Sequence, residues 1–102
     1  MAEFRSSPVM QELRAAYLKS LAAKMAEFAT ASSARDYVTV ARMGHQLKGS
    51  GQSYGLPQIS ALGIKMEEVA EFRRAALLEP LLAEFMTLMN TLVDEQSSPE
   101  KS

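Results

Sequence analysis

Apolar residues recur along the chain at steps of three and four, a spacing that places side chains on one face of an α-helix. The strict alternation of apolar and polar residues that marks a half-buried strand does not occur. The pattern predicts four amphipathic helices joined by short connections. We therefore expect an all-α fold, an antiparallel up-down-up-down four-helix bundle, over residues 8–96.

The first helix is expected over about residues 8–29 and the second from Ser33 to Gly55. Pro8 suits a first turn, where its missing N–H would have no partner in any case. Ser33 with Asp36 three residues later is typical of a capping box, and Gly55 is a natural helix stop. The inner faces are expected to hold Leu13, Tyr17, Leu21, Met25 and Phe28 in the first helix, and Tyr37, Val40, Ala41, Gly44, Leu47, Gly51 and Tyr54 in the second.

The third helix is expected to begin at Pro57 and to fade at the basic pair 73–74, and the fourth carries the strongest apolar stripe. A proline inside a helix loses a backbone hydrogen bond, so Pro80 leaves two alternatives. Either the fourth helix begins near Glu79, or residues 75–79 form a looser turn before it. The inner faces are expected to hold Ile59, Leu62, Gly63, Met66, Val69 and Ala70, then Leu78, Leu81, Leu82, Phe85, Leu88, Met89 and Leu92.

The composition narrows the class of protein. A chain of 102 residues is long enough for one domain with its own core. Eleven basic and twelve acidic side chains give no basic patch for nucleic acid, and the absence of cysteine excludes thiolate chemistry and disulfides. No apolar run approaches the roughly 20 residues of a membrane span, and MAEFRSS is too short and polar for a secretory signal. We expect a cytoplasmic monomer, with residues 1–7 as an N-terminal extension and residues 97–102 as a disordered polar tail.

The single histidine, His45, lies in the stretch GHQLKGSGQSYG, where four of the five glycines gather. On a helical wheel it falls about 110° from the centre of the second helix's apolar stripe, on its flank. Lys48 lies one turn along beside it, and Gln52 lies two turns along on the same flank. A lone histidine on a helix is most often a structural residue. The glycines nearby change that expectation.

A glycine inside a helix costs up to about 1 kcal/mol relative to alanine, so each one calls for a reason. Gly44 and Gly51 face inward, where they allow close helix packing. Gly49 does not face inward, and its best explanation is that it clears space beside the imidazole. Together with Lys48, this clearing favours a reactive His45 over a structural one.

A neutral imidazole is a competent nucleophile near pH 7 because its ordinary pKa is about 6.5. A phosphoryl group suits the neighbourhood of His45, since Lys48 can neutralise its oxygens and Gly49 leaves it room. The chain has no glycine-rich phosphate loop between a strand and a helix, and no acidic cluster for Mg²⁺. It is therefore expected to carry a phosphoryl group but not to transfer one unaided. The activating metal would come from a partner.

The segment HQLKGSGQSYG resembles the signature of histidine-containing phosphotransfer (HPt) domains. That pattern is histidine, any residue, an apolar residue, lysine, glycine, and then serine, glycine or alanine. The glycine and apolar residue that end this helix in the family also match, and KMEE puts an acidic residue in register on the next helix. The matched block covers residues 40–70, and the four-helix pattern extends the likeness to nearly the whole chain. The matching positions are His45, Leu47, Lys48, Gly49, Ser50, Gly55, Leu56 and Glu67.

The resemblance implies a role for each matching site residue. His45 would be phosphorylated on Nε2, Lys48 would screen the phosphoryl charge, and Gly49 would leave access for the partner. Glu67 would accept a hydrogen bond from Nδ1–H of the imidazole and so hold the tautomer that frees Nε2. On the wheel Glu67 lies on the flank of its helix, which permits that contact. Supporting positions are Ser50 and Gln52.

The partner that the resemblance implies is a response-regulator receiver domain, which would supply the phospho-aspartate and Mg²⁺. An upstream hybrid sensor histidine kinase would feed the relay. A docking patch should surround the imidazole, and exposed apolar residues are expected on that flank at Val38, Ala41 and Ile64. No cofactor or metal is expected on the chain itself, which would be a stoichiometric carrier and not an enzyme.

Other functions remain open. An HPt-like adaptor could bind a receiver or kinase without being phosphorylated, although such a protein has no reason to keep costly glycines. Seven methionines and one histidine could in principle supply axial ligands in a metal or haem bundle, but such sites need ligands that project into the core. A self-acting kinase is the least favoured, because no nucleotide-binding segment exists.

Overall fold

The structure is a computed structural model that describes residues 8–97, with side chains through residue 95. Between residues 8 and 97 the chain forms four long helices and one 3₁₀ turn, without a strand. The prediction of an all-α fold is confirmed. The elements are α2 (Pro8–Ala34), α3 (Tyr37–Ser53), α4 (Pro57–Glu71), η1 (Ala75–Leu77) and α5 (Leu78–Ser97).

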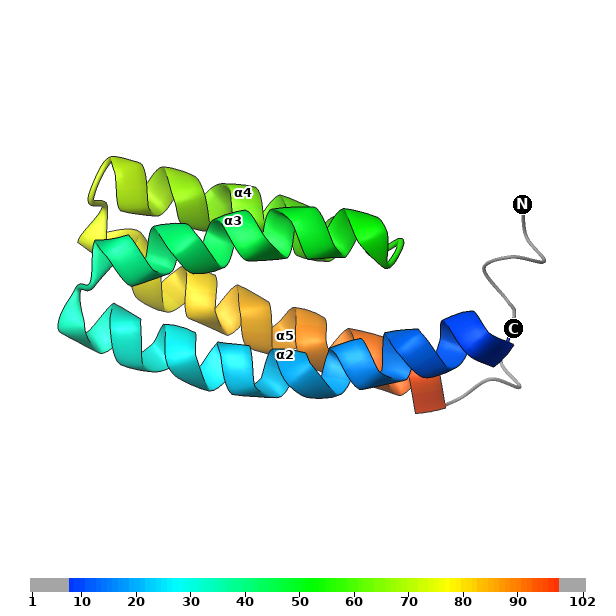
Figure 1. Cartoon of the computed structure of the whole chain (residues 1–102). Coiled ribbons are helices and arrows are strands. Elements are labelled where there is room, and N and C mark those ends of the chain that lie inside the picture. Colours follow the sequence, from blue (N-terminus) through cyan, green and yellow to red (C-terminus); the bar gives the residue numbers. More distant parts are fainter. Residues whose placement is uncertain (1–7, 98–102) are drawn as a thin grey trace.

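The four helices lie side by side, and the chain reverses direction at each connection between them (Figure 1). The closest pairing is that of α3 with α4, while α2 packs on α5 and on α3. The first turns of α2 reach past the turn that joins α3 to α4 (Figure 1). The helices α3 and α4 thus form a tightly packed hairpin, and α2 and α5 pack against it.

The expected inner faces line the core almost without exception. All six positions predicted on α4 are buried, and the stripe of α5 is buried or half-buried. Leu13 is the exception, with 48% of the residue exposed, because the early turns of α2 lie where α3 and α4 have already ended. The core also contains residues outside the predicted stripes, namely Leu18, Ala31, Met43 and Leu56.

The boundary between α2 and α3 differs from the expected one. Instead of ending near residue 29, α2 runs to Ala34 and stops where Arg35 takes a left-handed backbone conformation (φ 54°). Ser33 therefore lies inside α2 and does not open the next helix. Asp36 is the N-cap of α3: its carboxylate accepts hydrogen bonds from the Thr39 N–H (3.2 Å) and hydroxyl (2.6 Å).

The turn between α3 and α4 forms where it was expected. Gly55 has a positive φ of 69°, a conformation that glycine adopts without the clash that a Cβ brings. The Leu56 N–H donates to the Gly51 carbonyl at 2.7 Å, which satisfies an end of α3. Pro57 is the first residue of α4, where a missing N–H costs nothing.

The structure contains part of each alternative at Pro80: α5 begins one residue before Glu79, and a separate 3₁₀ turn precedes it. η1 covers residues 75–77 and α5 begins at Leu78, so Pro80 falls in the first turn of the helix, where N–H groups have no intrahelical partner. At the other end α5 continues to Ser97, one residue into the segment expected to be a disordered tail. The rest of that tail and the expected extension over residues 1–7 lie outside the described residues.

One helix in the described part of the chain, over Ala75–Glu95, is long and apolar enough for a membrane span by length and composition. The core helix of a soluble bundle passes the same test. Here the apolar character has a structural use, since α5 buries one stripe against the rest of the bundle: Leu78, Leu81, Phe85, Met89 and Leu92.

Candidate functional site

Glycines let the backbones of α3 and α4 approach closely beside the candidate site. A Cβ on Gly44 would lie 2.7 Å from the Gly63 carbonyl oxygen, and one on Gly63 would collide with the Gly44 carbonyl oxygen. Further along, a Cβ on Gly51 would lie 2.5 Å from the Ser60 nitrogen. We call this close contact at Gly44, Gly51 and Gly63 the glycine seam. Across it, the Ser60 hydroxyl donates a hydrogen bond to the carbonyl of Lys48 at 2.9 Å. The two helices are thus held in a fixed register.

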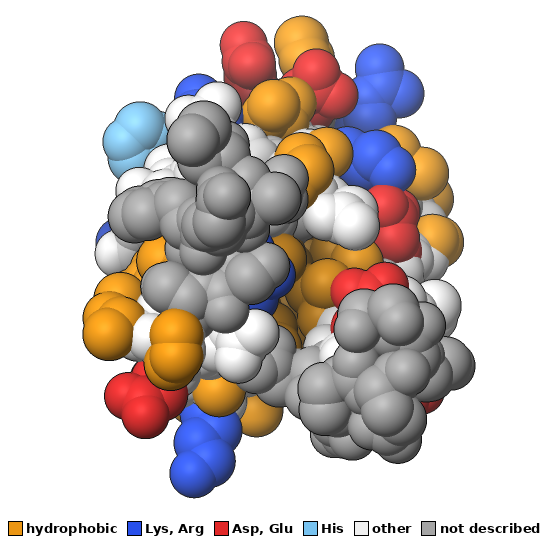
Figure 2. Space-filling model, turned by 90° about the vertical axis from the view of Figure 1, so that its right-hand side faces the viewer, with side chains coloured by type: hydrophobic (Ala, Val, Ile, Leu, Met, Phe, Trp, Pro, Cys, Tyr) orange, Lys and Arg blue, Asp and Glu red, His pale blue; other side chains and the backbone are white. Residues whose placement is uncertain are grey.

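The imidazole of His45 stands on the outer flank of α3, as the helical wheel predicted. Its side chain is 76% exposed, and in the space-filling view it projects at the edge of the molecule (Figure 2). Nδ1 lies 3.3 Å from Oε2 of Glu67 on α4. A carboxylate only accepts hydrogen bonds, so we assign the ring proton to Nδ1. Nε2, on the other side of the ring, makes no hydrogen bond with any described residue.

The carboxylate of Glu67 is shared between two basic groups. While Oε2 meets the imidazole, Oε1 lies 3.2 Å from Nζ of Lys48. Glu67 is the least exposed of the three side chains, at 29%. It comes from α4, whereas His45 and Lys48 are one turn apart on α3, so the site depends on the register that the glycine seam sets. The ammonium of Lys48 is thus paired with a carboxylate on the opposite helix.

The surface beside the imidazole is open at Gly49. A Cβ built there would meet no atom within 4 Å, so the glycine is not needed for packing. Gln52 is exposed one turn further on. The surface at Gly49 is therefore free of neighbouring side chains, as expected if this glycine clears space.

Ser50 faces α2 and not the imidazole. Its hydroxyl lies 2.6 Å from the phenol oxygen of Tyr17, whose ring stacks on Tyr54 at 4.3 Å between centroids. Burial raises the pKa of Tyr17, and the hydrogen bond with Ser50 offsets part of that rise. Arg14 adds a bond to the Tyr54 carbonyl at 3.2 Å. This cluster fastens the end of α3 to α2.

The three residues expected in a docking patch do not share one environment. Val38 is 82% exposed and Ile64 is 42% exposed, on either side of the imidazole along the hairpin. Ala41 is partly buried and packs against the core, so it presents less apolar surface than expected. Phe72, a residue that the sequence analysis did not place, is also exposed, at the end of α4. In the sequence it is a large apolar residue at the end of the third predicted helix that does not belong to that helix's apolar stripe.

The histidine and the core methionines lie in different environments. Within residues 8–97 no group of three His, Cys, Asp or Glu side chains is placed to hold a metal ion. The imidazole lies outside the core, while Met43, Met66 and Met89 fill the core among aliphatic side chains. These three methionine side chains serve packing.

The family to which the chain belongs follows from comparison with known proteins. The family model described as Hpt domain matches residues 12–97, most of the chain. The chain is a member of the Hpt domain family. No curated protein and no solved structure gave a significant match.

Hpt domains act in histidine phosphotransfer within phosphorelays. They are carriers of phosphoryl groups, not catalysts, and they interact with receiver domains and kinases. The resemblance seen in the sequence is confirmed at the level of the family. In this Hpt domain the only histidine is the one that the α3–α4 hairpin presents to solvent.

Proposed function

We propose that this Hpt domain accepts a phosphoryl group on Nε2 of His45 and exchanges it with the aspartate of a receiver domain. One observation carries the proposal: an exposed imidazole whose Nδ1 is engaged by Glu67 and whose Nε2 makes no hydrogen bond with the described residues. This arrangement leaves the nucleophilic lone pair directed at solvent, where a partner would bring the donor.

The transfer itself is a reversible displacement at phosphorus. The Nε2 lone pair attacks the phosphorus of the aspartyl phosphate, the bond between phosphorus and the aspartate oxygen breaks, and the carboxylate leaves with the electron pair. The proton stays on Nδ1, so the phosphorylated ring carries a positive charge. Glu67 faces that charge at 3.3 Å and stabilises it, because opposite charges favour each other most strongly at short range.

Lys48 and Gly49 act on the phosphoryl group under this proposal. The ammonium lies one helical turn from the imidazole, where it screens the charge on the phosphoryl oxygens. Gly49 leaves the approach open, since no side chain stands in the space next to it. In this proposal the aspartate and Mg²⁺ belong to the receiver, so the chain acts as a stoichiometric carrier. The proposal also includes a hybrid sensor kinase upstream, and a chain that works as a monomer in the cytoplasm.

The test compares the wild type with His45→Gln. We expect the wild type to take up phosphate from phosphoramidate and from a phosphorylated receiver, and the variant to take up none. The modification should be labile to acid and stable to base, as a phosphohistidine is. Gln46→Ala, next to the histidine, serves as the matched control and should be phosphorylated as the wild type is.

The outcome that contradicts the proposal is an unlabelled wild type. If both proteins bind a receiver equally and neither carries phosphate, the chain is an adaptor that does not use its histidine. Circular dichroism of both proteins shows whether His45→Gln keeps the helical fold, which an exposed position should allow.

A further inference from the structure

An uncharged hollow of about 380 Å³ lies at the turn between α3 and α4. We call it the turn hollow. No lysine, arginine, aspartate or glutamate lines it. Of its two polar side chains, Ser60 is already bonded to the Lys48 carbonyl and Gln52 lies exposed at the edge. It is lined by Gly51, Gln52, Gly55, Leu56, Pro57, Ser60, Ala61 and Ile64.

The turn hollow is built from a rigid part of the backbone. Gly51 has no side chain, and the backbone of α4 at Ser60 comes so close that a Cβ there would collide with it. The Leu56 carbonyl accepts from the N–H groups of Ile59 (3.0 Å) and Ser60 (3.3 Å), which fixes the start of α4. A group that enters such a preformed hollow loses its own freedom but does not have to order the protein.

The α3 edge of the hollow lies on the same side of the hairpin as the imidazole. Gln52, at its edge, is seven residues from His45, which is two turns or about 10.5 Å along α3 and nearly the same direction around it. Ile64, at its other edge, stands one turn from Glu67 on α4. A partner interface covers about 800 Å² on each side, roughly a disc of 16 Å radius. A protein centred on His45 would therefore reach the edges of the hollow at Gln52 and Ile64.

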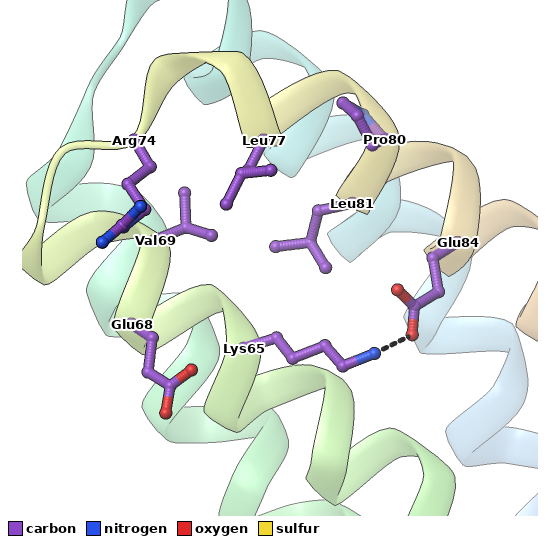
Figure 3. Close-up of a pocket in the computed structure, with 8 residues that line it drawn as sticks. All are labelled: Lys65, Glu68, Val69, Arg74, Leu77, Pro80, Leu81 and Glu84. Atoms are coloured by element: carbon purple, nitrogen blue, oxygen red, sulfur yellow. Dashed lines mark hydrogen bonds and ion pairs between the residues drawn. The ribbon is translucent and has the colours of Figure 1, made fainter.

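A second groove on the bundle has different chemistry. It holds about 410 Å³ between α4 and α5, where aliphatic side chains lie between Lys65, Glu68, Arg74 and Glu84 (Figure 3). Lys65 and Glu84 close one side with a 2.8 Å ion pair. Lys65 is two residues from Glu67 and so points to the opposite side of α4. The edge of this groove at Lys65 therefore faces away from the imidazole.

We propose that the turn hollow receives an apolar side chain of the receiver domain and so selects which receiver can exchange phosphate with His45. This inference rests on the proposed function, because the receiver must come to the imidazole. The absence of charge in the lining favours an aliphatic or aromatic side chain over a charged one, whose burial without a partner is costly. The exposed side chain of Ile64 lies between the hollow and the site and joins the two contacts.

The experiment fills the hollow and leaves the imidazole unchanged. Ala61 is exposed on α4 and lines the hollow, so Ala61→Phe should occupy it without disturbing the core. Ala83→Phe makes the same change at an exposed position of α5 and is the matched control. For both variants we would measure phosphorylation by phosphoramidate, which needs no docking, and transfer from a phosphorylated receiver.

We expect Ala61→Phe to slow transfer from the receiver by tenfold or more and to leave the phosphoramidate rate within twofold of the wild type. Ala83→Phe should change neither rate. Equal receiver transfer in Ala61→Phe and the wild type would overturn the role of the hollow. A matching fall in the phosphoramidate rate would also overturn it, because the effect would then act through the imidazole.

The two proposals fail in different ways. If wild-type protein is not phosphorylated by phosphoramidate, the proposed function fails before the hollow is tested. If wild type and Ala61→Phe are phosphorylated alike by both donors, only the hollow fails. Ala61→Glu gives a second variant, which places a charge in the lining, and it should slow receiver transfer in the same way while circular dichroism confirms the fold.

Discussion

At the scale of single residues, Glu67 decides how the imidazole is presented. Its two oxygens engage different groups, His45 through Nδ1 and Lys48 through Nζ. Removing this carboxylate leaves the ring without the partner that selects its tautomer, and leaves the ammonium without its anchor. A histidine in water prefers the proton on Nε2 only slightly, so one hydrogen bond is enough to change the ratio of the two tautomers.

We predict that Glu67→Ala changes the tautomer of His45 and slows its phosphorylation. Long-range proton–nitrogen NMR should show mainly the Nδ1–H form in the wild type and a mixture in the variant. The rate with phosphoramidate should fall by about tenfold, at the lower end of what the loss of an orienting carboxylate costs elsewhere. Glu84→Ala removes the partner of Lys65 instead and is the control. An unchanged NMR spectrum in Glu67→Ala would refute the orienting role.

At the scale of the helices, Asp36 holds the start of α3 through Thr39. The Thr39 hydroxyl and N–H both donate to the carboxylate, and these bonds lower the pKa of Asp36 below its ordinary 3.8. A lowered pKa in the folded state means that the ionised cap stabilises the protein above pH 3.8. This contribution is lost as the pH falls through the folded-state pKa.

We predict that Asp36→Asn removes one source of acid sensitivity. Asparagine is also a good N-cap but does not titrate, so the variant should lose less stability than the wild type between pH 5 and pH 3. The measurement is thermal unfolding followed by circular dichroism across that range. Asp36→Ala, which removes the cap altogether, should lower the Tm by a few degrees near neutral pH as well, on the order expected for a lost cap. Identical pH profiles for the wild type and Asp36→Asn would contradict the assignment.

Two glycines of the hairpin offer a matched pair of substitutions. We predict that Gly49→Ala raises the free energy of unfolding by up to about 1 kcal/mol, because alanine is the better helix former and its Cβ meets no other atom. Gly63→Ala should lower it by about 1–3 kcal/mol, because its Cβ would press on the backbone of Gly44 and Lys48. Urea unfolding of both variants checks the signs. A destabilised Gly49→Ala would show that this position also serves packing.

At the scale of the whole molecule, the fold and the direction of the site could be predicted from periodicity. The stripes of α3 and α4 are long and regular, so they placed His45 and Glu67 each on the flank of its own helix. The pairing of these two residues was implied by the family resemblance. Their direct contact depends on the distance between α3 and α4, which is short because the helices meet at Gly44 and Gly63. A helical wheel gives directions around one helix and not the distance between two. The ion pair between Lys48 and Glu67 was missed for the same reason.

The remaining differences come from contacts that a single helix does not reveal. Ser33 with Asp36 resembles a capping box, but α2 runs on to residue 34 because Ala31 and Ser32 are buried in the bundle. Ser50 matched the motif as a site residue, yet it lies on the far side of α3 from His45 and bonds with Tyr17. In both cases tertiary packing, not local propensity, sets the outcome.

The glycine seam between α3 and α4 also has a consequence for motion. Regions of a protein open separately, and those with the closest packing exchange their amide hydrogens last. The backbone amides of α3 and α4 around Gly44 and Gly63 should therefore exchange only when the whole bundle unfolds, whereas the first turns of α2, where Val9 and Leu13 are exposed, should exchange early. The proposed phosphoacceptor is thus expected on the slowest-exchanging part of the molecule, and the pairing of His45 with Glu67 should persist when other regions open locally.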